Sequence, residues 1–233
     1  MKKLNIILFL AGSYFSFSQN DFGFKVNGGF SQISAKLYSS PSIVTQNFYF
    51  VPSAQSGFLY NHHLGKRSLL GVEILFIQID GKEHMQNQEV DLYGNPTTFI
   101  TTTDIWRHIS YLGLPIYYGF KIKKFTLNIG IQLNLALKSS GRYKSEYIYN
   151  GDKITSDDKY NNLAIDSYDF GTKGGLIYNL SKKFAFEATY YYGFNNIYKY
   201  GNITFGNPRP LFNIKVQQIT LGLTYKFYTK EKR

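Results

Sequence analysis

The 233-residue chain contains no cysteine. This absence excludes a disulfide framework, thiolate metal ligands, a cysteine nucleophile and lipid attachment through cysteine. Acidic residues are also few, because 15 Asp and Glu stand against 26 Lys and Arg. Charged residues of both signs make up only 18% of the chain, whereas it carries 21 Tyr and 20 Phe. Low charge with many aromatic side chains argues against disorder, and the length suits a sizeable core or a closed barrel.

Long hydrophobic runs are missing after residue 20, where no stretch of 18 consecutive apolar residues occurs. We therefore expect no transmembrane helix in that part of the chain. The first residues differ, because a basic start at Met1–Lys3 is followed by a mostly apolar stretch, Leu4–Phe17. Small serines then precede a polar segment, which is the three-part layout of a secretory signal.

We predict a signal peptide over residues 1–18, cleaved after Ser18 with Gln19 as the alternative, and one domain over residues 19–233. A buried apolar first element is the other interpretation of the N-terminus. An exported chain without a helical anchor is either a soluble periplasmic or secreted domain, or an outer-membrane barrel.

The dominant pattern in the rest of the chain is a two-residue alternation of apolar with polar or small side chains. Residues 125–138 place large apolar side chains at odd positions, and residues 219–227 repeat the pattern without exception. Successive side chains of a strand point to opposite faces, so each stretch has one apolar and one polar face. Turn residues separate eight predicted strands, at 22–35, 54–64, 68–80, 105–121, 125–140, 164–180, 184–195 and 214–228.

The predicted connections alternate between tight turns and long polar loops. The tight turns are 64–67, 122–124 and 181–183, and the long loops are 36–53, 81–104, 141–163 and 196–213. An even strand count with short periplasmic turns and longer outer loops is typical of bacterial transmembrane barrels. We therefore predict an all-β fold, an eight-stranded antiparallel up-and-down transmembrane β-barrel.

Alternation alone does not decide which face is inside, because a soluble barrel or sandwich would turn its apolar face inward. Strand length and the position of the aromatic side chains favour a lipid-facing apolar surface. Aromatic residues gather near the predicted strand ends, at Phe22, Phe24, Tyr118, Phe120, Tyr190, Tyr192, Tyr225 and Phe227. The opposite face carries charged residues, at Lys25, Glu73, Lys138, Asp169, Lys173, Glu187 and Lys226.

We expect a plug of paired charges inside the barrel, because eight strands enclose only enough space for side chains. A proton or ion path is the alternative. The predicted plug consists of Lys25, Glu73, Asp169, Lys173, Glu187 and Lys226.

The histidines provide the candidate acid–base residues. Asp104 and His108, with His84 in the same loop region, are candidates for a rim-sited enzyme, but no residue stands out as the nucleophile. His62 and His63 are neighbours on a strand, so their rings point to opposite faces and cannot chelate one metal together. We expect no enzyme, no cofactor and no metal site.

Two further features have structural interpretations. Pro115 removes a ladder donor within a predicted strand, so we expect a bulge or kink there. Asp152, Asp157 and Asp158 lack the spacing of a calcium-binding loop and predict a solvated loop.

The basic excess is spread over both ends of the predicted barrel. Six cations lie at the short turns, at Lys66, Arg67, Lys123, Lys124, Lys182 and Lys183. Another six lie in the long loops, at Lys36, Arg142, Lys144, Lys153, Lys159 and Lys199. The loop cations are candidates for pairing with phosphates of lipopolysaccharide in the outer leaflet. The export signal argues against a nucleic-acid partner.

Several motifs resemble the PorT-like outer-membrane β-barrel domain, a family common in Bacteroidetes. They are Gly28-Gly29-Phe30-Ser31, the run Tyr111-Leu-Gly-Leu-Pro-Ile-Tyr-Tyr118 with Gly113 where the family usually has an acid, Tyr168-Asp-Phe-Gly171 and Gly174-Gly175. The last strand also resembles the signal read by the barrel-assembly machinery, with Thr220, Gly222, Tyr225 and Phe227 at its key positions.

The resemblance implies a Gram-negative outer-membrane location and the barrel-assembly machinery as a partner. It also makes an accessory role in protein secretion one version of the expected function. We therefore predict a structural or partner-binding barrel that contacts outer-membrane lipid and an envelope protein not identified by the sequence. The alternatives are a rim-sited enzyme acting on lipid or peptide, and a small channel or ligand carrier.

Overall fold

The computed structural model describes residues 20–37, 43–90, 93, 95–149, 151–161, 163, 165, 167–197 and 212–229. The predicted signal peptide and most of the predicted loop 196–213 lie outside these residues. No helix in the described segments is long and apolar enough to cross a membrane. These segments form one ten-stranded sheet: β1 (Asn20–Leu37), β2 (Ile43–Tyr49), β3 (Val51–His63), β4 (Ser68–Val90), β5 (Pro96–Ile122), β6 (Phe125–Tyr149), β7 (Asp152–Tyr160), β8 (Tyr168–Asn179), β9 (Phe184–Gly193) and β10 (Phe212–Thr229).

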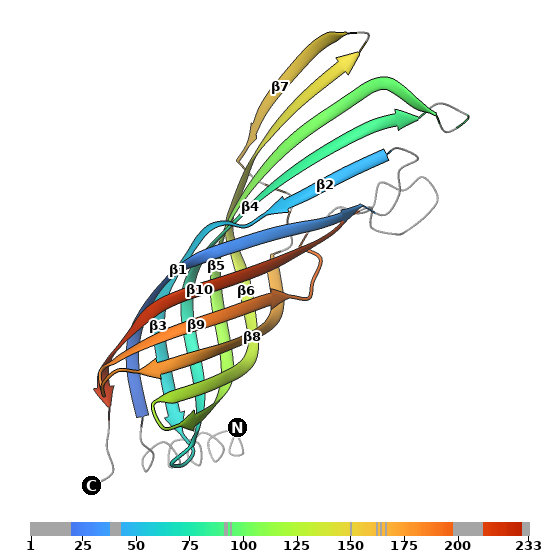
Figure 1. Ribbon diagram of the computed structural model, residues 1–233. Coiled ribbons are helices and arrows are strands. Elements are labelled where there is room, and N and C mark those ends of the chain that lie inside the picture. Colours follow the sequence, from blue (N-terminus) through green and yellow to red (C-terminus); the bar gives the residue numbers. More distant parts are fainter. Residues whose placement is uncertain are drawn as a thin grey trace, which may run out of the picture.

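Eight of these strands close into a barrel, in the order β1-β3-β4-β5-β6-β8-β9-β10. All pairings are antiparallel, and the ring closes where β1 pairs with β10. Figure 1 shows the ring in the lower part of the molecule, with the tight turns at its lower end. The turn between β5 and β6 uses Lys123 with a positive φ of 54°. The predicted fold class and all eight predicted strands are confirmed.

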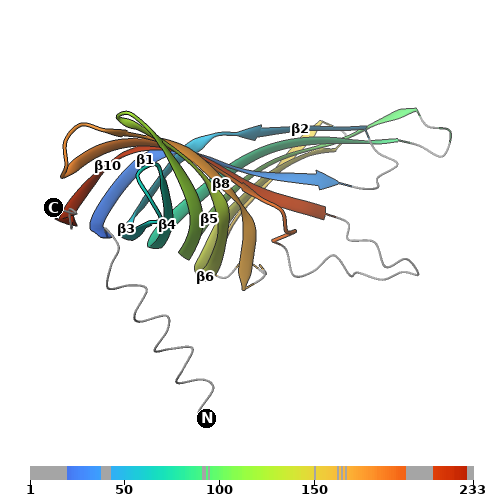
Figure 2. The ribbon, with the colours of Figure 1, turned by 90° about the horizontal axis from the view of Figure 1, so that it is seen from below.

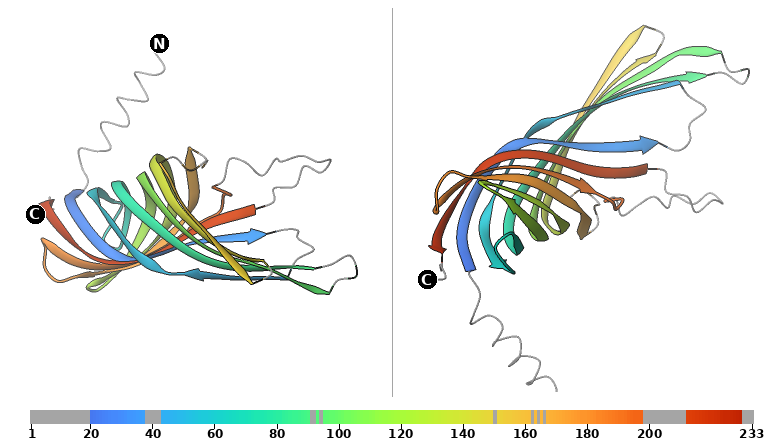
Figure 3. Two further views of the ribbon diagram at one scale, coloured as in Figure 1. Left: turned by 90° about the horizontal axis from the view of Figure 1, so that it is seen from above. Right: turned by 60° about the horizontal axis from the view of Figure 1, so that its bottom comes forward.

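Three barrel strands continue far beyond the ring. The upper parts of β4, β5 and β6 pair with one another, and β2 and β7 extend this region on either side, in the order β2-β4-β5-β6-β7. We call this five-stranded region the outer sheet; it leaves the barrel as a twisted blade (Figures 1 and 2). Figure 3 shows β2 and the outer ends of β4, β5, β6 and β7 on the same side of the barrel.

The outer sheet corrects the prediction of long loops at 81–104 and 141–163. Most of both segments is strand, and part of the predicted loop 36–53 is β2. Both faces of these strands are largely polar, so they lack the apolar alternation from which the other strands were predicted. Frequent Thr, Ile and Tyr residues still favour extended backbone there.

The outer surface of the barrel is apolar, as predicted. Side chains at alternate positions are exposed, and Ile129 and Leu221 reach 67% and 66% exposure. Most of the predicted aromatic residues at strand ends are exposed on this surface, namely Phe22, Phe24, Tyr118, Phe120, Tyr190, Tyr225 and Phe227. In water such a surface would be unfavourable, and in a bilayer it faces lipid tails.

The barrel interior contains two layers. Its middle is polar and charged, whereas its outer end is packed with buried apolar side chains from β1, β4, β5, β9 and β10. This apolar layer consists mainly of Ile33, Leu75, Ile77, Ile79, Ile109, Tyr111, Tyr191, Ile214 and Val216. The alternation predicted a polar interior, so this apolar layer was not expected from the sequence.

Two local predictions on β5 and β6 need correction. The β4–β5 ladder skips the pairs at Pro115 and Leu114, which fits the missing donor, yet its register is the same on both sides, so the bulge that was one of the two predicted forms is absent at Pro115. The register shift lies instead at Ser110/Tyr111 in the β5–β6 ladder. The extra residue in β6 reverses the facing of the side chains, and Lys138 is exposed rather than interior.

Candidate functional site

Four of the predicted plug residues meet in the middle of the barrel. The Lys25 Nζ donates to Glu73 Oε1 at 2.9 Å and to Glu187 Oε1 at 2.6 Å. Lys173 Nζ donates to Glu73 Oε2 at 2.6 Å. These residues belong to β1, β4, β8 and β9, and all four are buried. The charge cluster therefore ties together strands from both sides of the ring.

Uncharged polar side chains continue this network. Asn27 donates to Glu187, and Thr220 Oγ1 accepts a hydrogen bond from Gln55 at 3.0 Å. Thr189 and Thr220 share a hydrogen bond of 2.7 Å. Thr220 thus lies in the interior, while Tyr225 and Phe227 of the same predicted assembly signal are exposed on the lipid-facing surface.

The other two predicted plug residues lie elsewhere in the interior. Asp169 accepts a hydrogen bond of 2.7 Å from the Tyr191 hydroxyl, next to the apolar layer. Lys226 pairs with Asp21 at 3.0 Å, and His63 contacts the same carboxylate at 3.1 Å. The six residues therefore occupy three levels of the barrel rather than one cluster.

Two His–Asp pairs lie at the base of the outer sheet. His84 Nδ1 lies 2.8 Å from Asp104 Oδ1, and His108 pairs with Asp80. Both pairs join residues directly opposite in the β4–β5 ladder. The structure thus pairs Asp104 with His84 and gives His108 another partner, Asp80, which was not predicted from the sequence. Ser140 lies opposite His108 on β6, which completes an Asp80–His108–Ser140 row across three strands.

A second row crosses five strands, two residues farther along β4, β5 and β6 from the barrel than the first row. It consists of Tyr49, Lys82, Trp106, Arg142 and Lys159, each opposite the next. Lys82 Nζ lies 5.6 Å from the centroid of the Tyr49 ring and 5.4 Å from that of Trp106. The Arg142 guanidinium carbon lies 5.7 Å from the Trp106 centroid. We call these five residues the cation–aromatic row.

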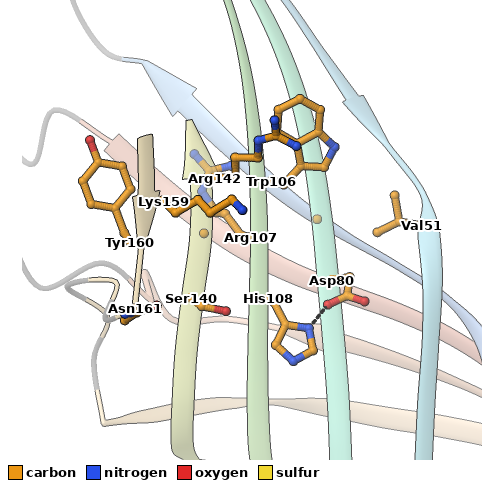
Figure 4. A pocket seen from close by; sticks show the side chains of 12 residues that line it. Val51, Asp80, Trp106, Arg107, His108, Ser140, Arg142, Lys159, Tyr160 and Asn161 are labelled. Carbon is orange, nitrogen blue, oxygen red and sulfur yellow. Dashed lines mark hydrogen bonds and ion pairs between the residues drawn. The ribbon is translucent and has the colours of Figure 1, made fainter. Parts of the chain in front are cut away.

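The Asp80–His108–Ser140 row and three residues of the cation–aromatic row, Trp106, Arg142 and Lys159, line an open pocket of about 500 Å³. Figure 4 shows Trp106 beside Arg142 in the upper part of the pocket and the Asp80–His108 pair below them. Residues separated by an even number of positions on one strand share a face. Asp80 therefore shares the lipid-facing side of β4 with Phe76, and Trp106 and His108 share that of β5 with Ile116. The pocket therefore lies on the outer surface and outside the barrel lumen.

Arg142 is anchored by a carboxylate. Its Nε and Nη2 donate to the two oxygens of Asp157 on β7, at 2.8 Å and 2.5 Å. This bidentate hydrogen bonding lowers the pKa of Asp157 and raises that of Arg142. Asp158 instead accepts a hydrogen bond from Ser156 at 2.7 Å. The predicted solvated loop that contains these aspartates is a strand.

The family follows from sequence comparison. The model of the outer membrane protein beta-barrel domain matches residues 17–199. The chain belongs to this family. Comparison with curated proteins gives no match. The outer-membrane location and the barrel architecture expected from the sequence are therefore supported by both the family and the fold.

Several solved structures resemble this outer membrane protein. Neisserial surface protein A is 11% identical with a TM-score of 0.42, over 88% of this chain and 97% of that one. Ail of Yersinia pestis is 11% identical with a TM-score of 0.38, over 90% and 99%. OprG of Pseudomonas aeruginosa is 13% identical with a TM-score of 0.35, over 91% and 95%.

The loop cations of this outer membrane β-barrel protein are mostly strand residues. Arg142 and Lys144 lie on β6, and Lys153 and Lys159 lie on β7. Lys153 pairs with Glu146 at 2.9 Å. Lys199 lies outside the described residues. In the described part of the chain, no group of three metal-binding side chains forms a candidate metal site.

Proposed function

We propose that this outer-membrane barrel has a structural, partner-binding role and that the outer sheet is its binding surface. The observation that carries the proposal is the projection of this sheet beyond the ring of the barrel. Its outermost strand, β7, pairs only with β6 among the described residues. Nearly all side chains of β7 are exposed. An exposed strand edge offers backbone donors and acceptors to an added strand.

The filled interior supports a role other than transport. The charge cluster occupies the middle of the lumen, and the apolar layer covers it toward the outer end. An eight-stranded ring has little room beyond these side chains. The partner-binding surface is therefore expected on the outside of the molecule and not in the lumen.

The resemblance to the PorT-like domain of Bacteroidetes supports a more specific version. In this version the protein is exported by a signal peptide over residues 1–18, is inserted by the barrel-assembly machinery and serves as an accessory of protein secretion. Its partner is then an envelope protein that contacts the outer sheet or the periplasmic turns.

Site-specific photo-crosslinking in the native envelope tests the proposal. A photoreactive residue at Thr155 of β7 is expected to give one discrete crosslinked envelope protein. The same residue at Lys182 in the opposite turn reports a periplasmic partner, and at Ile129 it serves as the lipid-facing control. Absence of any discrete protein adduct at both Thr155 and Lys182 would contradict a partner-binding role.

A second candidate function is hydrolysis of lipid esters by the Asp80–His108–Ser140 row. Asp80 pairs with the His108 Nδ1, which leaves Nε2 available to a serine. Residues opposite each other on neighbouring strands have Cβ atoms about 4.5–5.5 Å apart, so Ser140 is within reach of His108 by side-chain rotation. The row also lies on the lipid-facing side of the sheet.

Fatty-acid release from labelled lipopolysaccharide or phospholipid vesicles distinguishes the two functions. The enzyme predicts turnover by the wild type, loss in Ser140→Ala and retention in Ser156→Ala. No release by the folded wild type would eliminate the enzyme and leave the partner-binding role.

A further inference from the structure

The cation–aromatic row lies above the part of the barrel that contacts lipid tails. On β4 the outward side chains run from Leu70 to Phe76 as apolar residues and then become Gln78, Asp80 and Lys82. Lys82 is six residues beyond Phe76, which is about 20 Å along the strand at about 3.4 Å per residue. Because the strands are tilted, the height is smaller. The row therefore lies in the headgroup zone of the outer leaflet.

Cationic charge at this level exceeds anionic charge. Arg142 is paired with Asp157, and Asp80 is paired with His108. Lys82 and Lys159 have no ion pair with any residue that the structure describes, and Lys138, nearer the apolar surface on β6, has none either. Three lysines therefore remain to attract an anion on the membrane side of the outer sheet.

The geometry of the row suits a phosphate attached to a sugar. Lys82 Nζ lies between the rings of Tyr49 and Trp106, which hold its stem in place. Lys159 extends over the pocket from the other side, next to Arg142 (Figure 4). Aromatic side chains at membrane interfaces are amphipathic anchors, and ammonium groups are strong donors to phosphate oxygens.

We propose that the cation–aromatic row binds the phosphorylated saccharide headgroup of an outer-leaflet glycolipid, with Lys82 and Lys159 contacting the phosphate. Arg142, fixed by Asp157, keeps the Trp106 ring in position as one wall of the site. The glycolipid acyl chains then lie against the apolar residues below, so that one face of the barrel contacts both ends of the same lipid. This site is independent of the partner-binding role, since it uses side chains on the membrane side of the sheet, including Lys159, rather than the exposed backbone edge of β7.

The only tryptophan of the chain is Trp106, so its fluorescence reports on this row alone. The full-length protein is reconstituted in phosphatidylcholine vesicles and titrated with lipopolysaccharide, with the same material after phosphatase treatment, and with inorganic phosphate. We expect a saturable change in Trp106 emission with intact lipopolysaccharide only.

Charge removal provides the matched comparison. The measured quantity is the lipopolysaccharide concentration at the midpoint of the Trp106 emission change. Loss of one interfacial cation is expected to raise this midpoint about fivefold in Lys159→Gln and about 25-fold in Lys82→Gln/Lys159→Gln. Lys182→Gln/Lys183→Gln removes the same charge from a turn at the opposite end and is expected to leave the midpoint unchanged. The mobility shift after boiling on a denaturing gel verifies that each variant is folded.

Three outcomes would overturn the proposal. An equal response to dephosphorylated lipopolysaccharide would mean that phosphate is not recognised. An equal response to inorganic phosphate would show a free-anion site in place of a lipid site. An unchanged midpoint in folded Lys159→Gln would show that Lys159 does not contact the phosphate. This conclusion does not need the double variant, because Lys159 lies on the exposed strand β7 and its substitution is not expected to disturb folding.

Discussion

Glu73 is the carboxylate that bridges the two buried lysines of the barrel interior. Its two oxygens accept hydrogen bonds from Lys25 and Lys173, which lie on different strands, and its side chain is 2% exposed. Removing one partner of a buried ion pair leaves an uncompensated charge, which costs about 3–5 kcal/mol. We expect Glu73→Gln to lower the free energy of unfolding by about this amount.

Urea unfolding of the refolded barrel in detergent micelles measures this effect. Glu89→Gln in the outer sheet removes the same charge at an exposed position and is the control, with an expected change below about 0.5 kcal/mol. Equal stability of the two variants would show that the charge cluster does not hold the ring together.

Asp157 gives the outer sheet an acid-sensitive contact. Hydrogen bonding to Arg142 lowers the pKa of Asp157 below its usual range. A depressed folded pKa means that the contact is fully present above the unfolded pKa of about 3.9 and is lost as the pH falls through the folded value. Since Arg142 lies over Trp106, we expect the loss of this contact to change the Trp106 emission in this acid range.

An acid fluorescence titration checks this prediction. Asp104 and Asp80 lie near the same ring, so the decisive comparison is with Asp157→Asn, in which the transition assigned to Asp157 should disappear. Asp158→Asn, with its carboxylate on the opposite face of β7, should titrate like the wild type. A wild-type curve in Asp157→Asn would assign the transition to another group.

Individual side-chain partners were only partly predictable. The composition of the interior face correctly placed Lys25, Glu73, Lys173 and Glu187 inside, because alternation fixes the facing of each strand residue. The partners of His84 and His108 depend on the β4–β5 register, which continues unchanged into segments that polar composition assigned to loops. Lys138 was misplaced because a single extra residue in β6 reverses the alternation.

At the scale of elements, the seam between β1 and β10 is the closure of the barrel. Its register runs from Asp21 opposite Thr229 to Leu37 opposite Phe212. Gly29 lies where a Cβ atom would overlap the backbone carbonyl oxygen of Ile219 on β10, whereas a Cβ atom at neighbouring Gly28 would meet nothing within 4 Å. We expect Gly29→Ala to push the two strands apart and to destabilise the barrel by about 1–3 kcal/mol.

Gly28→Ala is the matched control, since it adds the same methyl group one position away on the opposite face. The temperature at which the cold-detergent form converts to the boiled form measures the difference. A lower conversion temperature in Gly29→Ala alone supports the seam as the tight point, and identical temperatures in both variants would contradict it.

The strands could be predicted from the sequence where one of their two faces contacts lipid. Strands such as β6 near Ile129 and β10 near Leu221 alternate clearly, because every second side chain is lipid-facing. The outer sheet lies beyond the lipid tails, so no face needs to be uniformly apolar and the two-residue period disappears. Strand pairing continues there because the barrel strands already hold the hairpins in register.

At the scale of the whole molecule, the packing of the lumen predicts electrical behaviour. The polar middle and the apolar outer layer fill the interior with side chains from both sides of the ring. We expect the purified protein to give no steady single-channel current in a planar bilayer at moderate voltage. Stable openings that persist in a preparation verified as folded would contradict the filled lumen.

The pairing of β1 with β10 also has a consequence for biogenesis. Because β1 and β10 must meet, the ring cannot close until all of β10 has been synthesised and exported. Contacts between residues so far apart in sequence form slowly. During its passage the polypeptide exposes both its apolar surfaces and unpaired strand edges, which are aggregation-prone. We therefore expect the unclosed chain to need protection from aggregation before insertion, and the β1–β10 seam to form late in folding.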